Sequence, residues 1–307
     1  MRHNGRMAGK GFNILINRRS GTVLNMGEAA VEAAIHDSGL EVAELCLSEP
    51  DKMSENLDRF IKGSQPLLVG GGDGTIRESA RVLSERGKAF GVLPFGTMNL
   101  LPHDLGIDTL QQALKAYAQG VRTDAIDAGF VNGELFLCCA SIGTMPQASV
   151  YREQKRDVAK LWLFPQLFMF VLDNLDRHKR ERIVLDIDGE MSRFHTPAVV
   201  VSANRFADSD KLTESNFKRR TLDGGELAAY VMTTKSRVSQ MRVLMRLVFG
   251  HWLRDPDLKE MTGNRIKLWS RHKKALVSID GEVETLRTPL EFTLKPRYVK
   301  VLIPEAG

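Results

Sequence analysis

The sequence predicts an α/β fold with a parallel sheet for the first part of the chain and an antiparallel, β-rich, sandwich-like fold for the second. Short apolar segments alternate with helical patterns as far as residue 122, which is typical of parallel strands joined by helices. From about Thr123 strand-like segments follow one another closely, and Asn-Gly or Asp-Gly pairs join several of them. We therefore expect two domains, over residues 1–122 and from residue 123 onward.

The first domain should contain four strands and three helices. The strands are predicted at residues 12–16, 42–47, 67–69 and 90–93, and the helices at 22–38, 51–61 and 76–86. Loops at 17–21, 48–50, 70–75 and 94–99 all follow strands. They should therefore gather at the carboxyl edge of the sheet, where open α/β folds bind their ligands.

The second domain should be built from short strands, with two segments of another kind. The strands are predicted at residues 124–130, 134–140, 183–187, 198–202, 227–232, 265–269, 276–279, 290–294 and 298–303. Residues 161–172 are apolar but too few to cross a bilayer, which takes about 20 residues, and basic residues flank them. Residues 237–254 form a helical run with Arg242 and Arg246 one turn apart. Each segment is expected either to lie on a lipid surface or to pack within the domain.

Composition narrows the class of protein. A formal charge of +5 is mildly basic and suits an anionic membrane surface or nucleotides. Cys46, Cys138 and Cys139 form no disulfide or metal-ligand pattern, which favours a reducing compartment. The basic first residues lead to no apolar signal segment, so we expect a cytoplasmic protein.

The most informative segment is the glycine-rich run from Gly70 to Thr75, between an apolar strand and a helix. Glycines let the backbone approach a phosphate, and the N–H groups at the start of the helix point toward it. Asp73 would repel that phosphate unless a metal ion or a proton acceptor is needed there, as in phosphoryl transfer. The spacings of a P-loop and of a dinucleotide fingerprint are both absent. No structural partner for Asp73 is evident, so Asp73→Asn is expected to affect turnover more than stability.

Four separated segments together resemble the diacylglycerol kinase catalytic family, which includes sphingosine kinases and soluble bacterial lipid kinases. They are Asn17-Arg18-Arg19-Ser20-Gly21, the run GGGDGT at 70–75, Pro94-Phe95-Gly96-Thr97-Met98-Asn99, and Ser278-Ile279-Asp280-Gly281-Glu282. The resemblance implies an ATP-binding domain like those of NAD kinases and diacylglycerol kinases, to which the segment at about 296–307 returns. Residues 123–295 would then form the lipid-substrate domain.

The resemblance also implies residue roles in an ATP- and Mg²⁺-dependent reaction. The implied nucleotide-binding residues are Asn17, Ser20, Gly21, Ser48, Gly71, Gly72, Asp73, Gly74, Thr75, Glu78, Gly96 and Thr97. Of these, residues 72–75 would hold the phosphates, Glu78 would support that loop, and Asp73 would hold Mg²⁺ together with the phosphates. Asp280 and Glu282 would accept the proton of the lipid hydroxyl and face Asp73, and the shorter Asp280 is the favoured base.

The chain departs from the family pattern at several positions. Arg18 stands where proline is usual and Leu100 where an aspartate is usual, for which Asp104 is either a substitute or a surface residue. The turn that holds a structural metal in some bacterial members reads Asp223-Gly224-Gly225, so one carboxylate is missing and a metal at Asp223 stays open. The sequence after Asn204 also replaces a glycine-rich stretch.

We therefore expect a lipid kinase that transfers the γ-phosphoryl group of ATP to a hydroxyl of a diacylglycerol-, sphingosine- or related membrane lipid. Such a protein would be cytoplasmic, would visit the inner membrane surface, and could form a homodimer. An NAD kinase-like phosphotransferase and a catalytically weakened nucleotide- or lipid-binding regulator are the alternatives. Nucleic acid is not an expected partner, because no RNA-binding motif accompanies the basic runs at 218–220 and 271–274.

Overall fold

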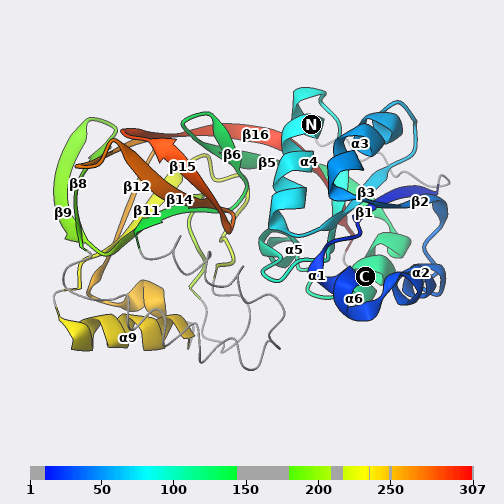
Figure 1. Ribbon diagram of the computed structural model, residues 1–307, viewed down its shortest axis with the longest axis horizontal. Coiled ribbons are helices and arrows are strands. Elements are labelled where there is room, and N and C mark those ends of the chain that lie inside the picture. The colour runs from blue at the N-terminus through cyan, green and yellow to red at the C-terminus, as the bar shows by residue number, and fades with distance from the viewer. Residues whose placement is uncertain (1–10, 144–179, 209–216, 235, 249–250, 306–307) are drawn as a thin grey trace. The chain divides into compact units, whose positions relative to one another are not determined.

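The computed structural model describes residues 11–143, 180–208, 217–234, 236–248 and 251–305. The chain divides into two compact units, which are described separately below. Unit 1 consists of Met1–Ile126 with Arg297–Gly307, and unit 2 of Asp127–Pro296. Figure 1 draws unit 1 mainly in blue and cyan and unit 2 mainly in green, yellow and orange.

Unit 1 is a parallel sheet with helices. Its strands lie in the order β2 (Val42–Ser48), β1 (Phe12–Asn17), β3 (Leu67–Gly71) and β4 (Phe90–Pro94), and the end of β16 (Leu290–Pro304) runs parallel beside β4. The helices are α1 (Gly21–Met26), α2 (Glu28–His36), α3 (Met53–Ile61) after the short 3₁₀ turn Pro50–Lys52, α4 (Asp73–Glu85), α5 (Leu100–Asp104) and α6 (Leu110–Gln119).

The inner strands of this sheet are apolar on both faces, as expected when helices cover a parallel sheet. The hydroxyl group of Tyr117 in α6 links strand β4 to strand β16. Its buried hydroxyl accepts the N–H of Val92 at 2.9 Å and lies 3.3 Å from the carbonyl oxygen of Leu302. Burial raises the pKa of Tyr117, so this hydroxyl stays protonated as a donor.

Three sequence predictions for unit 1 need correction. The single helix at 22–38 is two helices, because Gly27 has a φ of 85° between α1 and α2. The predicted loop at 70–75 is shorter, since β3 continues to Gly71 and α4 already begins at Asp73. Helices α5 and α6 lie where no element was predicted.

Unit 2 is a sandwich of antiparallel strands. One sheet has the order β12 (Leu258–Gly263), β11 (Leu227–Met232), β10 (Ala198–Ala203), β7 (Cys139–Gly143), β14 (Lys274–Ile279) and β15 (Glu282–Arg287). The other contains β16, β13 (Arg265–Ser270), β8 (Glu181–Ile187) and β9 (Glu190–Thr196), with β5 (Val121–Val131) and β6 (Glu134–Phe136). Phe136, Val201, Leu268 and Ile279 are among the buried residues of one core that both sheets share.

The strand predictions for unit 2 are correct in kind but differ in their limits. The Asn132-Gly133 turn has the two positive φ angles of a type I′ hairpin, as predicted. The predicted strand at 134–140 is divided, because β6 and β7 belong to different sheets. The predicted strands at 290–294 and 298–303 form the single strand β16, and β9, β12 and β15 were not predicted. The segment 161–172 lies outside the described residues.

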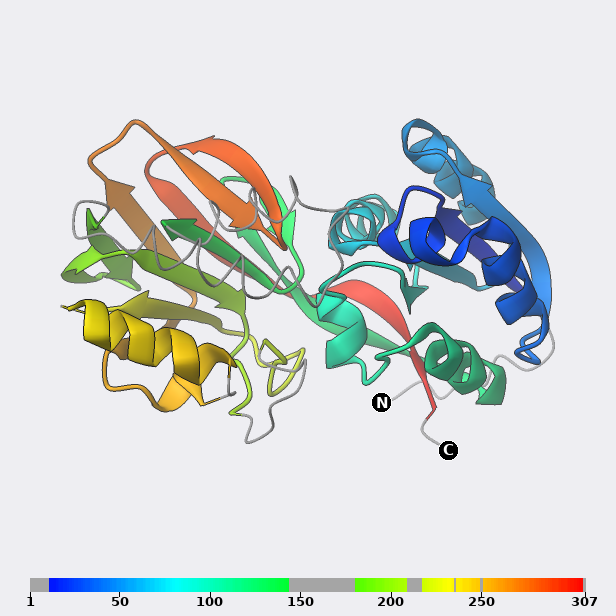
Figure 2. The ribbon, with the colours of Figure 1, turned by 60° about the horizontal axis from the view of Figure 1, so that its bottom comes forward.

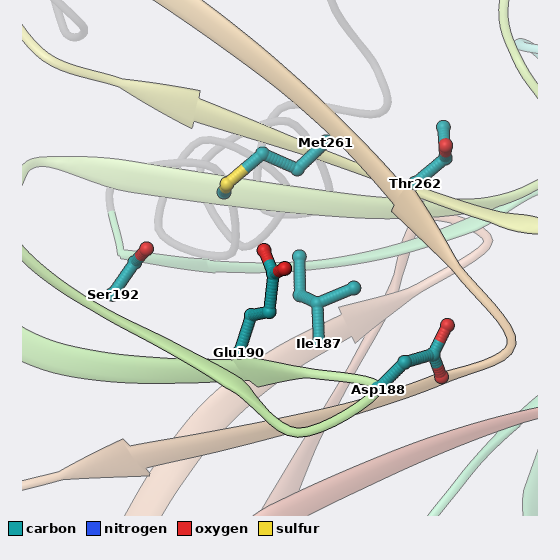
Figure 3. A pocket seen from close by; sticks show the side chains of 6 residues that line it. All are labelled: Ile187, Asp188, Glu190, Ser192, Met261 and Thr262. Atoms are coloured by element: carbon teal, nitrogen blue, oxygen red, sulfur yellow. The ribbon is translucent and has the colours of Figure 1, made fainter.

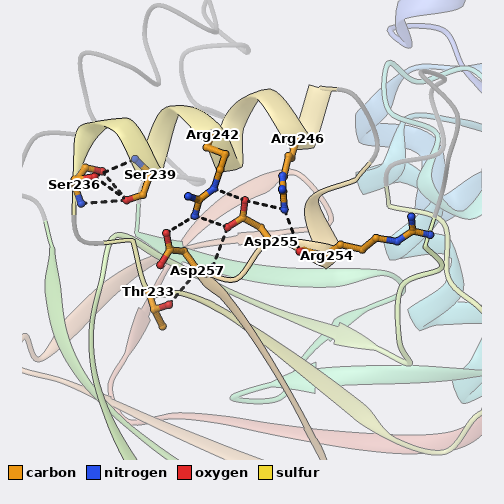
Figure 4. Close-up of polar contacts among 8 residues, drawn as sticks. All are labelled: Thr233, Ser236, Ser239, Arg242, Arg246, Arg254, Asp255 and Asp257. Carbon is orange, nitrogen blue, oxygen red and sulfur yellow. Dashed lines mark hydrogen bonds and ion pairs between the residues drawn. The ribbon is translucent and has the colours of Figure 1, made fainter.

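Helix α9 (Arg237–Val248) packs by ion pairs within unit 2, as Figure 4 shows. Arg242 donates two 3.0 Å hydrogen bonds to Asp255, whose side chain is fully buried, and one of 2.5 Å to Asp257. Arg246 lies 3.4 Å from Asp255. Although burial alone would raise it, the pKa of Asp255 is lowered, mainly by the hydrogen bond from Arg242. These contacts favour the packing alternative for residues 237–254. No helix in the described ranges is long and apolar enough to cross a membrane.

Replacing Arg242 by alanine should lower the free energy of unfolding measurably, because Asp255 loses two hydrogen bonds while it keeps the contact with Arg246 and the N–H of Asp257. Chemical denaturation measures this. The matched control is Arg59→Ala, which breaks an exposed pair with Glu44 and should cost about 1 kcal/mol or less. Equal effects of the two substitutions would show that the Asp255 cluster does not hold α9.

Candidate active site

The loops after β1, β3 and β4 contact one another at the carboxyl edge of the unit 1 sheet. Asn17 Nδ2 donates to Thr75 Oγ1 at 3.0 Å, and Asn17 Oδ1 accepts the N–H of Arg19 at 2.9 Å. The N–H of Thr22 donates to the carbonyl oxygen of Phe95 at 3.1 Å. The predicted meeting of these loops is therefore present, and the start of α4 lies among them.

Two glycines allow the loops to approach through their backbones. A Cβ atom added to Gly96 would lie 2.8 Å from the Cα of Gly72, and one added to Gly71 would lie 2.5 Å from the Thr75 side chain. The N–H of Gly96 also donates to Asn99 Oδ1 at 2.7 Å. Packing alone therefore requires glycine at positions 71 and 96, whether or not a ligand also approaches these residues.

Asp73 has a structural role that the sequence did not reveal. Its carboxylate accepts the N–H of Leu100 at 2.7 Å and that of Asn99 at 3.2 Å, so the first residue of α4 caps the start of α5. The expectation that Asp73 lacks a structural partner is wrong. The side chain of Leu100 is buried, and it is the backbone of Leu100 that contacts the site.

The other residues that were predicted to bind the nucleotide differ from one another in burial and in their contacts. Ser20 is buried before Gly21 opens α1, and buried Ser48 accepts a 3.0 Å hydrogen bond from Asn56. Thr97 is exposed, and Gly74 lies in the first turn of α4. Glu78 differs from its expected role, because its described contacts are hydrogen bonds of 2.6 and 2.9 Å with Arg81 of the same helix, not with the glycine loop.

Arg18, which stands where the family has proline, links two of the loops. Its guanidinium donates to Glu28 at 2.7 and 3.0 Å and to Glu49 at 2.9 Å, and its N–H donates to the carbonyl oxygen of Ser48 at 3.0 Å. Hydrogen bonds from the guanidinium to these two carboxylates raise the pKa of Arg18. The loop after β1 is thereby tied to the end of β2 and to α2. No spacing rule in the sequence predicts this link.

Asp280 and Gly281 form the two-residue turn between β14 and β15, with φ angles of 47° and 92°. The Asp280 carboxylate is 3% exposed and accepts the N–H groups of Leu137, Cys138 and Cys139 at 2.6, 2.9 and 3.0 Å. Two residues further, Glu282 is exposed at the start of β15. An exposed carboxylate can take a proton from a substrate, whereas one holding three backbone donors is poorly suited to do so. Asp280 therefore has a structural role, and Glu282 is the more exposed of the two predicted proton acceptors.

Arg219 and Asp127 are buried polar residues that the sequence reading did not identify as anchors. Arg219, from one of the basic runs, is 3% exposed and donates to the carbonyl oxygens of Leu137 and Ala203. Asp127 is fully buried and accepts the N–H of Gly225 at 2.7 Å. Arg219 thus holds the carbonyl oxygen of Leu137, whose N–H is held by Asp280, and Asp127 fixes the turn at residues 223–225.

Asp223 supplies a single carboxylate to its turn. Within the described part of the chain, it is not part of a group of three or more His, Cys, Asp or Glu side chains that could hold a metal ion. A Cβ atom at Gly224 would lie 2.7 Å from Oδ1 of the buried Asn204, so only glycine fits where a second carboxylate is usual. The missing carboxylate thus has a steric reason.

A cavity of about 330 Å³ lies between the β8–β9 hairpin and β12, as Figure 3 shows. Its lining residues are Ile187, Asp188, Glu190, Ser192, Met261 and Thr262. None of these is a predicted site residue, and most of them are polar. The cavity therefore lacks the apolar lining that a lipid chain requires.

Comparison with known families agrees with this arrangement. The profile of the diacylglycerol kinase catalytic domain matches residues 12–131, and that of the YegS C-terminal NAD kinase beta sandwich-like domain matches residues 155–303. The two matches follow each other in the order of the two units. The chain belongs to the diacylglycerol kinase catalytic family. Within that family it is of the bacterial lipid kinase type, with a β-sandwich as its second domain.

Relatives match this chain over very different shares of its length. An uncharacterized protein of Synechocystis, sll0036, is 22% identical over 90% of this chain and 62% of its own length. A probable lipid kinase, YegS-like, of Pseudomonas aeruginosa is 36% identical over 37% of this chain and 38% of its own length. The matches thus span less than two thirds of these relatives.

Solved structures with this fold align with nearly all of this chain. A diacylglycerol kinase from Bacillus anthracis has a TM-score of 0.66 at 15% identity and covers 96% of this chain and 97% of its own. A further Bacillus anthracis chain has a TM-score of 0.74 at 17% identity and covers 99% of this chain and 98% of its own. The predicted fold class of both domains is confirmed.

Gly96→Ala should lower the free energy of unfolding by about 2 kcal/mol, because the added methyl group forces the two glycine loops apart. The matched control is Gly72→Ala, whose Cβ would meet only the Gly96 Cα at an ordinary 3.8 Å. That control should change stability by less than about 1 kcal/mol. Denaturant titration of both variants measures the difference, and a stable Gly96→Ala protein would contradict the close backbone contact.

Proposed function

We propose that this protein is an ATP- and Mg²⁺-dependent lipid kinase, which phosphorylates a hydroxyl of a diacylglycerol-, sphingosine- or related membrane lipid. The observation that supports this most is the contact between the glycine-rich start of α4 and the loops after β1 and β4. Such an arrangement presents backbone N–H groups to an anion, as a nucleotide phosphate requires.

The proposed nucleotide lies at the carboxyl edge of the unit 1 sheet. The first N–H groups of α4, at residues 73–75, have no partner within the helix and would face the phosphates. Asn17, Ser20 and Gly21 would contact the nucleotide from the first loop, and Thr97 would close its adenosine side. Magnesium would be held by Asp73 together with the phosphates, which suits an ion that proteins usually bind through one or two carboxylates. It would neutralise the charge that develops on the transferred group.

The proposed proton acceptor is Glu282 of unit 2. It begins a strand whose turn is anchored by the three backbone hydrogen bonds of Asp280, so its backbone position is fixed while its side chain is exposed. Asp280 is then a positioning residue. That both carboxylates face Asp73 stays a prediction. Because the acceptor lipid lies in a bilayer, the protein would act at the inner membrane surface as a peripheral protein.

Incubation of the protein with radiolabelled ATP, Mg²⁺ and a lipid panel tests the proposal. The panel should contain diacylglycerol, sphingosine and monoacylglycerol, with NAD as a separate soluble acceptor. We expect label in a lipid product, dependent on Mg²⁺. Label in NADP would identify an NAD kinase-like phosphotransferase. Nucleotide binding without label in any product would identify a regulator and would end the kinase proposal.

Glu282→Gln should lower kcat by about 10²–10⁴ with little effect on stability, because it removes the proton acceptor only. Asp280→Asn should lower the free energy of unfolding by about 2 kcal/mol, because an amide cannot accept all three backbone N–H groups. Steady-state kinetics and denaturation of both variants separate these roles. Normal stability with lost activity in Asp280→Asn, and near-normal activity in Glu282→Gln, would instead make Asp280 the base.

A further inference from the structure

Four consecutive basic or titratable residues follow β13, and all are exposed: Arg271, His272 and Lys273 lie in the turn, and Lys274 is the first residue of β14. Lys274 lies directly opposite Arg287 of β15, so a fifth basic side chain joins them. Two like charges opposite each other in a sheet normally destabilise the pair. A sheet that keeps this arrangement has a surface suited to an external anion.

These cations are not neutralised within the described part of the chain. There, Arg271, Lys273, Lys274 and Arg287 form no ion pair with a carboxylate, and Arg271 Nε instead lies 3.0 Å from His272 Nε2. Glu181 lies at the base of the turn, where it accepts a 3.3 Å hydrogen bond from Ser270. Arginines elsewhere in unit 2 behave differently, since Arg205, Arg242 and Arg265 all pair with acids.

An exposed apolar side chain lies on the same face of the β14–β15 hairpin as Lys274. Successive residues of a strand point to opposite faces, so Lys274 and Leu276 share a face while Ala275 and Val277 face the core. Leu276 is 48% exposed, which is unusual for a large aliphatic residue in the middle of a strand. Figure 2 draws this hairpin in orange, and β15 is the edge strand of its sheet. Lys274, Leu276 and Arg287 share one face of the strands, and Arg271 and Lys273 lie in the adjoining turn. We call these five residues the basic hairpin face.

We propose that the basic hairpin face docks on an anionic lipid bilayer. The inference rests on the proposed function in one respect, because that function gives the protein a substrate in the membrane. Two cations on the same strand face as an exposed leucine, with two more in the adjoining turn, match a surface of lipid phosphates above an apolar layer. A nucleic acid suits the face less well, since no aromatic side chain is present among its residues for stacking on bases.

The charge of the face sets the size of the expected effect. Each Lys or Arg near an anionic membrane strengthens binding by about fivefold, so the loss of three should weaken it by about a hundredfold. The attraction acts over about 10 Å at 0.1 M salt, so binding should also fall as salt rises.

Sedimentation with vesicles tests the proposal without nucleotide or turnover. The vesicles contain either phosphatidylcholine alone or phosphatidylcholine with 30 mol% phosphatidylglycerol. The test variant carries Arg271→Gln, Lys273→Gln and Lys274→Gln. The control carries Lys62→Gln, Lys88→Gln and Lys115→Gln, which remove the same charge from exposed positions of unit 1. A single Leu276→Ser variant measures the apolar contribution.

We expect the unmodified protein and the control to bind the anionic vesicles and the test variant to lose about a hundredfold in affinity, with a smaller loss for Leu276→Ser. Equal losses in test and control variants would mean that net charge alone governs binding and would overturn the proposal. Binding of a single-stranded RNA oligonucleotide that the same triple variant abolishes, without vesicle binding, would also overturn it and assign the face to nucleic acid. Phosphorylation of a short-chain diacylglycerol in detergent should be unchanged in the test variant. A docking failure is thereby distinguished from a failure of the kinase proposal, which would remove that activity from the unmodified protein as well.

Discussion

The three backbone hydrogen bonds to the Asp280 carboxylate are the contact on which unit 2 depends most. They gather the N–H groups of residues 137–139, where the chain leaves β6 in one sheet and enters β7 in the other. Leu137 and Cys138 lie between the two strands and are buried, so their N–H groups would otherwise lack partners, which is costly. Arg219 holds the carbonyl oxygen of Leu137 in the same segment. One buried charge thus fixes the link between the sheets and the turn that carries Glu282.

Most of the fold could be predicted because its signals are local. A few adjacent residues are enough to indicate the conformation of a continuous apolar segment such as 67–69 or of the Asn132-Gly133 pair. The errors arose where a distant residue decides the outcome. The division of the strand at 134–140 depends on a carboxylate more than 140 positions away, and no local pattern reveals it. The edge strand β12 was missed because its exposed and half-buried residues show no clear alternation.

For the candidate site, the sequence predicted the loops correctly but not the roles of single side chains. The sequence located the loops because glycine-rich turns after strands are recognisable, and the motifs carried the family resemblance. The sequence could not assign a role to each carboxylate. Asp73 and Asp280 accept hydrogen bonds from backbone groups of other elements, whereas Glu282 is exposed. The same limit hid Arg18, whose partners Glu28 and Glu49 become neighbours only when α2 and the loop after β2 are in place.

The central claim is that the start of α4 and the loop after β4 form a nucleotide phosphate site. Hydrogen–deuterium exchange in the presence of Mg²⁺ and a non-hydrolysable ATP analogue tests it at the level of single amides. The account predicts slower exchange for the amides of residues 73–75 and 96–97, with no such protection when adenosine replaces the analogue. Unchanged exchange at these amides, with protection by the analogue appearing elsewhere in the chain, would contradict it.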